Sequence, residues 1–435
     1  MQDKSFVVTD PIEDVVIPFG CNAVYMYTFS GLLDDIDIPD SVVHIELCDE
    51  YRARLTSNSL PKHLQVLVLG GNYTHEIDKS IFPENLVCLI FGFSYNCELN
   101  ENSLPINLEI LDLGILYNHP IHHSFFPPTL RSLRLGVEFN HDLDEDSLPK
   151  NLEELAISHD YSHVLRSECF PDSLIKLDLG SGYSQRLNSN SLPVNLKELF
   201  IGSEYSHELR PKVFPDSLEI LHLQQSFHYT LTHKHLPKNL VELSLMNRDD
   251  SDINLSKCSD KLKLIRLSYS SDYKLRRNTL PDTLQVLILS WEYSRRLRRG
   301  VLPSGLLKLD LGYSYNHPIK SEIFPDTLEH LVIGNLFDSK IDIDCLPANL
   351  KYLEISDEDH FELLGGAGGL KFTVVCSRKI DIPTNFSFIL AYFSEFEYDQ
   401  SLHNMGEIVI GGTTYNQLIN PERYVAYSVA KSAKK

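Results

Sequence analysis

Six histidines share one spacing in this chain, each lying fourteen residues after a position that is usually proline. They are His75, His119, His141, His163, His207 and His317. Imidazoles stacked at the separation of neighbouring strands, about 5 Å, could bind a row of metal ions. However, the same position also holds Cys97, Gln185 and Tyr229, and no further ligand type accompanies the histidines. We therefore interpret this histidine column as a polar, turn-facing feature and expect neither a metal nor a cofactor.

Patterns typical of enzymes are missing. The run Gly365-Gly366-Ala367-Gly368-Gly369 lacks the Gly-Lys-Ser/Thr ending of a phosphate-binding loop. The chain has no Gly-x-Ser-x-Gly or His-Glu-x-x-His segment, and no cysteine has the companions of a nucleophile. The chain contains many Asp and Glu residues, but spacing singles out no two of them as a catalytic pair. We expect a protein that is not an enzyme.

A 22-residue frame positions these side chains. Prolines stand at positions 39, 61, 83, 105, 127, 149, 171, 193, 215, 237, 281, 303, 325 and 347, and only Ser259 interrupts the series. The frame contains fifteen units. In each unit apolar residues, nearly all leucine or isoleucine, follow the proline position by three, six, eight and sixteen residues, and in twelve units Tyr or Phe follows it by twelve.

Each unit predicts one coil of a solenoid. The segment Leu64-x-x-Leu67-x-Leu69 ends with a period of two, which indicates a short strand with alternate side chains buried. A small residue, often Gly, then turns the chain, and the return segment ends in an apolar-Pro pair that disfavours helix. We predict a mainly β, leucine-rich-repeat-like solenoid of about fifteen coils with extended return segments and degenerate caps at both ends.

A family resemblance rests on an aromatic-Asn-x-Pro-Ile signature. It is complete in Tyr117-Asn118-His119-Pro120-Ile121 and Tyr315-Asn316-His317-Pro318-Ile319, and Phe139-Asn140 keeps its first half. On these motifs, residues 39–368 resemble the FNIP-repeat family, a relative of leucine-rich repeats found chiefly in amoebae and giant viruses. The resemblance implies a protein-interaction repeat. Some such proteins carry an F-box that docks to a ubiquitin ligase, but Met1–Ile38 lacks its leucine- and proline-rich helical pattern.

A basic cluster stands out in this acidic chain. It consists of Lys274, Arg276, Arg277, Arg295, Arg296, Arg298 and Arg299. The 22-residue offset places Arg276 beside Arg298 and Arg277 beside Arg299, so like charges stack across adjacent coils. Such stacking is destabilising unless solvent or a partner compensates it. The cluster is either a solvated face or a docking surface for an acidic partner or for the acidic surface of another copy of the chain.

Apolar residues also recur five and seven positions after the proline, where the side chains of the strand should point outward. They include Val66, Val68, Ile90, Ile110, Val286 and Ile288, with Trp291 just beyond. Exposed apolar patches often mark protein contacts, and the single tryptophan of the chain is a candidate anchor. Coverage by a cap segment or simple β-propensity is the alternative interpretation.

We divide the chain into three regions. Residues 1–38 form an N-terminal cap with a degenerate coil, residues 39–368 the solenoid, and residues 369–435 a divergent, strand-rich C-terminal cap with a frayed basic tail. After the glycine-rich turn, Phe372 and Val375 keep the 22-residue frame. The alternative for Lys371–Lys435 is a small enzymatic domain.

Composition limits the function further. With 43% hydrophobic and 23% charged residues the chain is globular, and its net charge of -21 argues against binding nucleic acid or anionic membrane. No apolar run approaches the ~18 residues of a membrane span. The chain starts without a secretory pattern, and its eight cysteines form no Cys-x-x-Cys pair. We expect an intracellular, cytoplasmic scaffold that binds an unidentified protein, or else a ubiquitin-ligase substrate receptor without a clear F-box.

Overall fold

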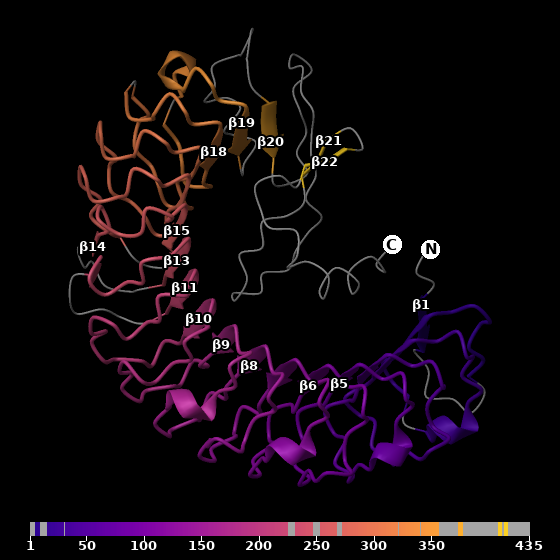
Figure 1. Cartoon of the computed structure of the whole chain (residues 1–435). Coiled ribbons are helices and arrows are strands. Elements are labelled where there is room, and N and C mark those ends of the chain that lie inside the picture. The colour runs from indigo at the N-terminus through magenta and orange to yellow at the C-terminus, as the bar shows by residue number, and fades with distance from the viewer. Residues whose placement is uncertain are drawn as a thin grey trace. The chain divides into compact units, whose positions relative to one another are not determined.

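The computed structural model describes residues 5–8, 15–29, 31–224, 231–246, 253–267, 272–320, 322–339 and 341–355, together with the backbone of three later strands. The fold is a parallel β-solenoid of about fifteen turns with almost no helix, as the 22-residue frame predicts. Contacts divide it into two compact units, Met1–Gln225 (unit 1) and Ser226–Lys435 (unit 2). Figure 1 shows the strands of each unit stacked side by side along its coils.

Unit 1 contains one continuous parallel ladder. Its strands are β1 (Ser5–Val8), β2 (Ala23–Met26), β3 (His44–Leu47), β4 (Val66–Val68), β5 (Cys88–Ile90), β6 (Ile110–Asp112), β7 (Ser132–Arg134), β8 (Glu154–Ala156), β9 (Lys176–Asp178), β10 (Glu198–Ile201) and β11 (Ile220–Leu223). From β3 onward each strand pairs with the next at an offset of 22 residues, as in Leu67↔Leu89 and Leu89↔Leu111. The first two steps are shorter, with Ser5↔Ala23 and Ala23↔His44.

Unit 2 repeats this arrangement with two additions. Its strands are β12 (Leu231–Thr232), β13 (Glu242–Leu245), β14 (Ile253–Asn254), β15 (Leu264–Leu267), β16 (Val286–Ile288), β17 (Lys308–Asp310), β18 (His330–Ile333), β19 (Tyr352–Ile355), β20 (Thr373–Cys376), β21 (Ile408–Ile410) and β22 (Thr413–Tyr415). Strands β13 and β15–β20 form a parallel ladder in which each strand pairs with the next. The additions are a parallel pair β12–β14 and an antiparallel pair β21–β22.

The last strand of the unit 2 ladder corrects one expectation. Val374, not Val375, pairs with the central residue Leu353 of β19, and Val375 pairs with Glu354. The step is therefore 21 residues instead of 22. Because side chains alternate along a strand, a slip of one residue exchanges the inward and outward positions. The other expectations for residues 369–435 lie outside the described residues, apart from the backbone of β20, β21 and β22.

The core is the set of leucines that the frame places inward. In β4, Leu67 is fully buried while Val66 and Val68 are half-exposed, and Leu64 and Leu69 on either side are also buried. Because a strand alternates its side chains, one leucine per strand faces the interior and its two neighbours face outward. Coils of both units repeat this pattern.

A column of buried aromatic rings runs parallel to each ladder. Tyr95 and Tyr117 stack with centroids 6.4 Å apart, and Phe139 and Tyr161 stack at 6.5 Å. In unit 2, Tyr293 and Tyr315 stack at 6.3 Å. Neighbouring strands lie only about 4.8 Å apart. The coils of each unit therefore spread towards the aromatic side, and the unit curves with its strands on the inner side.

Glycine is required where the chain leaves three of the strands. Gly114, Gly180 and Gly312 have φ angles of +78°, +71° and +74°, which other residues rarely adopt. In each case the N–H donates to the aspartate two residues earlier, for example Gly114 N to Asp112 Oδ1 at 2.9 Å. The sequence Asp-Leu-Gly is therefore a turn that ends the strand.

Single 3-10 turns interrupt the return segments, which the sequence predicts to be extended. They are η1 (Leu33–Asp35), η2 (Lys79–Ile81), η3 (His123–Phe125), η4 (Ser167–Cys169) and η5 (Ile343–Cys345). The turns η2, η3 and η4 start 44 residues apart, so they occur in every second coil. The intervening coils instead place a buried serine before Leu-Pro, such as Ser103, whose Oγ accepts from Asn100 N at 2.9 Å. In this region the structural repeat is a pair of coils.

Candidate protein-binding surfaces

The histidine column links neighbouring coils by hydrogen bonds. The Nε2 atoms of His119, His141 and His163 lie 3.0, 3.1 and 3.1 Å from the carbonyl oxygens of Asn96, Asn118 and Asn140. A carbonyl oxygen can only accept, so Nε2 carries the proton. Cys97 Sγ and Arg295 Nε donate to the preceding coil in the same way. The position therefore favours a side chain that donates a hydrogen bond to the preceding coil.

The asparagine of the signature is equally structural. Asn96 Oδ1 accepts from Asn118 N at 3.0 Å, Asn118 Oδ1 from Asn140 N at 3.1 Å, and Asn140 Oδ1 from Ser162 N at 3.0 Å. Each side chain thus satisfies a backbone donor of the next coil. Tyr-Asn-His recurs because it joins coils, so its recurrence does not mark a functional site.

A second column of this kind lies two residues after the proline position. Asn85 Nδ2 donates to Lys62 O at 3.0 Å, and Thr129 Oγ1 donates to Ile106 O at 2.9 Å. The sequence carries a signal for this column that the leucine frame does not include: Asn, Ser or Thr occupies the position in every unit except those with His63, Lys261 and Gly305.

Unit 1 carries an apolar patch on the outward side of three adjacent strands. The patch consists of Val66, Val68, Cys88, Ile90 and Ile110. The strand register places Val66, Cys88 and Ile110 in one row, and Val68 and Ile90 in another. Four of the five side chains are half-exposed, and Ile110 is 44% exposed. The predicted outward residues of these strands therefore form one continuous surface.

Polar residues border this apolar patch along the ladder. His44 and Glu46 of β3 lie on one side. On the other side, Arg134 of β7 pairs with Asp112, with Nε 3.3 Å from Oδ2. Beyond the strand ends, Phe93 on the coil of β5 and Val137 on the coil of β7 are also exposed apolar side chains. An apolar centre with a polar rim is the typical layout of a protein-binding surface.

Unit 2 has a smaller apolar group on its outward strand face. Val286 and Ile288 of β16 are half-exposed, and Val286 pairs with Leu264 of β15. Trp291 lies three residues after Ile288 and stacks on Tyr313 of the next coil, with centroids 4.2 Å apart and planes 6° from parallel. Trp291 thus belongs to an aromatic pair with 37% of its surface exposed.

The basic cluster lies on the return segments of unit 2 and is partly neutralised. Arg295 Nε is 3.1 Å from Asp272 Oδ2, and Arg299 Nη1 is 2.9 Å from Glu322 Oε2. Arg277 Nε donates to Arg299 O at 3.0 Å, which confirms that these arginines occupy neighbouring coils. All members except the half-buried Arg295 are exposed, namely Lys274, Arg276, Arg277, Arg296, Arg298 and Arg299.

Two of these arginines replace a capping residue. Seventeen residues after the proline, most coils place a side chain that accepts from a nearby backbone N–H, as Asp78 does from Ser80 N at 2.9 Å and Asn100 from Asn102 N at 2.9 Å. Arg276 and Arg298 occupy this cap position in unit 2, and Lys320 follows in the next coil. Guanidinium and ammonium groups have no acceptor. At this position these coils carry positive charge instead of a side-chain acceptor, and the Arg276 turn is closed by Arg276 N, which donates to Thr279 Oγ1 at 3.3 Å.

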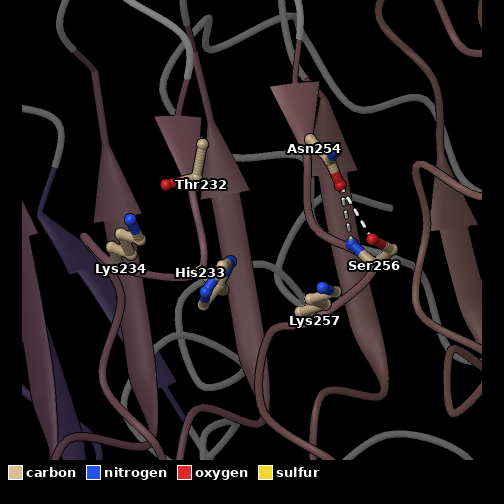
Figure 2. A pocket seen from close by; sticks show the side chains of 6 residues that line it. All are labelled: Thr232, His233, Lys234, Asn254, Ser256 and Lys257. Atoms are coloured by element: carbon tan, nitrogen blue, oxygen red, sulfur yellow. Dashed lines mark hydrogen bonds between the residues drawn. The ribbon is translucent and has the colours of Figure 1, made fainter.

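Unit 2 also contains a shallow polar depression of about 240 Å³ (Figure 2). It is lined by Thr232, His233, Lys234, Asn254, Ser256 and Lys257. Asn254 Oδ1 accepts from Ser256 N at 3.3 Å and from Ser256 Oγ at 2.8 Å, so both residues are engaged in a local turn. The lining contains no carboxylate or thiol that His233 could activate, and it does not resemble a catalytic site.

The FNIP Repeat family model matches residues 51–94, 73–115, 117–160, 161–204, 205–247, 272–314 and 315–358. These segments cover more than half of the sequence. The chain belongs to the FNIP-repeat family. Each match to an FNIP repeat spans about the length of two coils.

Two known proteins show similarity to this FNIP-repeat chain. The crystal structure of CroV588, described as a novel circular leucine-rich-repeat protein, is 26% identical with a TM-score of 0.64, over 84% of this chain and 57% of that one. A probable serine/threonine-protein kinase, fnkE of Dictyostelium discoideum, is 33% identical over 67 residues, which is 15% of this chain and 5% of the kinase. The chain thus spans little more than half of CroV588 and a small part of the kinase.

Disulfide bonds join none of the cysteines whose side chains the structure describes, namely Cys21, Cys48, Cys88, Cys97, Cys169, Cys258 and Cys345. Within the described ranges, no helix has the length and apolar character needed to cross a membrane.

Proposed function

We propose that this FNIP-repeat protein is a non-enzymatic scaffold that binds another protein through the apolar patch of unit 1. The observation that carries the proposal is the continuity of Val66, Cys88 and Ile110 across three paired strands, with Val68 and Ile90 beside them. The solvent-facing side of a sheet ordinarily carries polar residues. Five apolar residues in register leave a surface that gains free energy when a partner covers it.

The basic cluster of unit 2 supports a second contact with an acidic protein. Two of its exposed arginines, Arg276 and Arg298, occupy cap positions where most sister coils use hydrogen-bond acceptors. The cluster thereby concentrates positive charge on neighbouring coils of an acidic chain. Clustered arginines attract carboxylates and speed association with an acidic surface.

Two alternatives remain open. A substrate receptor of a ubiquitin ligase would use the same apolar patch and would differ in recruiting a ligase adaptor. An enzymatic C-terminal domain would involve Lys371–Lys435, of which only the backbone of β20, β21 and β22 is described. An intracellular location is supported by the free thiols, since cysteines stay reduced in the cytosol.

Proximity labelling with the full chain in its native cell tests the main proposal. The test variant combines Val68→Glu and Ile90→Glu, which place charges in the apolar patch. The matched control is Ala156→Glu, at an equally outward position of β8. We expect the set of labelled neighbours to lose a protein with the double variant and to keep it with the control. Identical neighbours for all three chains, with unchanged circular dichroism, would show that the patch is not the binding surface.

A further inference from the structure

Three metal-ligating side chains meet on the return segments of two neighbouring coils in unit 1. They belong to His122, His123 and Asp146 (the His-Asp cluster). One ligating atom of each lies within 4.8 Å of the other two. No other group of this kind occurs in the parts of the chain that the structure describes. His122 is half-buried, and His123 and Asp146 are exposed, so an ion can enter from solvent.

The fold holds these side chains on one side of the turn η3. His123 N donates to Asp146 O at 2.7 Å, which fixes the two coils relative to each other. His123 Nδ1 lies 3.0 Å from the same carbonyl oxygen and 3.8 Å from Asp146 Oδ1. His122 precedes the turn, with its Nδ1 2.8 Å from Ser124 Oγ. The two imidazole centroids are only 4.2 Å apart, so both rings face the same region.

The sister pairs of coils show that the backbone does not impose these ligands. The equivalent bond joins Lys79 N to Asn102 O at 2.7 Å, and Ser167 N to Asn190 O at 2.7 Å. At the first of these rungs, Lys79 Nζ donates to Asn102 Oδ1 at 2.7 Å. Lysine and asparagine there satisfy the same inter-coil contact without any metal ligand. The two histidines and the carboxylate at the contact between His123 and Asp146 are therefore a local exception, because the same backbone contact elsewhere carries other side chains.

We propose that His122, His123 and Asp146 bind a divalent transition-metal ion, with Zn²⁺ as the best fit. Two imidazole nitrogens and one carboxylate oxygen are a preferred donor set for Zn²⁺, whereas Mg²⁺ and Ca²⁺ prefer oxygen alone. Bond lengths of about 2.0–2.1 Å require ligating atoms roughly 3.3 Å apart, so small side-chain rotations close the site. Three protein ligands leave a position for water or for a donor from a partner.

The electrostatic surroundings favour a cation. Asp144 and Glu145 immediately precede Asp146, and Asp142, which pairs with Arg166 at 3.5 Å, lies two residues before Asp144. The carboxylates of this run create a negative potential that raises the local concentration of cations. The bound ion would join the coil of His122 to the coil of Asp146 and stabilise their contact.

The test is a calorimetric titration of the full, chelator-treated chain with Zn²⁺. The ligand-free variant combines His122→Asn, His123→Lys and Asp146→Asn, which introduce side chains that sister coils already carry at the corresponding positions, so folding is preserved. We expect one site in the natural chain and at least a tenfold loss of affinity in this variant. Retention of the full affinity, or the absence of a site in the natural chain, would overturn the proposal.

Two further variants distinguish the cluster from the histidine column. His119→Gln with His141→Gln removes the rival imidazoles and should leave the titration unchanged; a loss of the site here would also overturn the proposal. The transplant Asp78→His, Lys79→His and Asn102→Asp should raise the stoichiometry from one ion to two. Because both rungs share their backbone contact, a stoichiometry that stays at one would show that the three side chains do not suffice as ligands.

Discussion

The cap positions of the two units differ in chemistry. In unit 1 most coils place an acceptor there, as Asp78, Asn100 and Asp144 do, and the turn that follows is closed by a hydrogen bond. In unit 2, Asn254 and Asp342 keep such an acceptor, whereas Arg276, Arg298 and Lys320 stand at this position in three consecutive coils. In unit 1, Arg166 and Arg210 stand there, but never in consecutive coils. The burial of leucines and aromatics is the same in both units. The buried core is therefore the same in both units, whereas the return segments vary, with a hydrogen-bond acceptor in some coils and a positive charge in others.

The units also differ in regularity. The alternation of 3-10 turns with buried serines runs through unit 1 from η2 to η4. In unit 2 the corresponding position holds Thr279 and then the apolar residues Val301 and Ile323 in the next two coils, so the alternation stops. The regular pairing of coils is therefore found in unit 1, whereas the basic cluster is found in unit 2.

The largest effect should come from the central strand leucines. Leu111→Ala in β6 and Leu309→Ala in β17 each remove a fully buried side chain, and each should lower the free energy of unfolding by about 3–5 kcal/mol. Trp291, the only tryptophan, reports unit 2 by fluorescence, whereas circular dichroism reports both units. We expect Leu111→Ala to shift the dichroism transition in urea and to leave the fluorescence transition in place. Equal shifts of both signals would mean that the units unfold together.

A smaller loss should follow from breaking the asparagine column. Asn118→Ala removes the acceptor of Asn140 N and should cost about 1–2 kcal/mol. Asn316→Ala, which deprives Asp338 N in unit 2, is the matched change. Hydrogen exchange measures the result directly, because the amide of Asn140 or Asp338 should lose protection in its own variant only. Undiminished protection of both amides would contradict the assigned role.

The strand-ending aspartates predict a pH dependence. Burial raises the pKa of Asp310 to about 6, although Gly312 N–H and Lys308 oppose the shift. The unfolded carboxyl titrates near 3.9. The folded state therefore binds more protons between about pH 4 and 6, and this group makes unit 2 more stable as the pH falls through that window.

Asp310→Asn should remove that contribution and still accept from Gly312 N. We expect the difference between the free energies of unfolding at pH 7 and pH 4.5 to change by about 1 kcal/mol or less, because Asp310 is only half-buried. Asp112→Asn in unit 1 is the counterpart, since burial raises the pKa of Asp112 as well. Trp291 fluorescence should detect the Asp310 change and not the Asp112 change.

The smallest effect concerns the cap positions themselves. Arg276→Asp and Arg298→Asp should each stabilise unit 2 by about 0.5–1 kcal/mol, because they restore an acceptor and separate like charges. Asp78→Arg should destabilise unit 1 by a similar amount. Urea midpoints followed by the two signals measure both changes. Destabilisation by Arg276→Asp would show that the arginine makes a structural contribution that outweighs the cap.

Much of the fold was predictable because its causes are local and repeated. Leu64, Leu67 and Leu69 indicate the strand, and the aromatic column follows from Tyr117 and its counterparts. The outward positions of Val66 and Val68 were also correctly placed, since alternation along a strand leaves no other orientation. The slip at Val374 was not predicted, because Phe372 and Val375 fit the 22-residue frame in the sequence and only the strand register shows the shift.

The surfaces were less accessible to prediction. Arg295 was grouped with the basic cluster, yet it occupies the histidine column and pairs with Asp272. The His-Asp cluster gave no recognisable spacing, because Asp146 lies one coil and one residue beyond His123. The spacing alone places Arg295 in the histidine column. Its pairing with Asp272, and the approach of Asp146 to His123, depend on which atoms of adjacent coils face each other.

The sequence by itself determined the 22-residue coil, its inward leucines and aromatics, and its membership of a repeat class. These depend on alternation and period, which are properties of the chain. The tertiary structure alone decided the curvature of each unit, because aromatic rings 6.3–6.5 Å apart exceed the spacing of the strands. It also decided which side chains of different coils meet, as at His123 and Asp146, because such contacts depend on how one coil packs on the next.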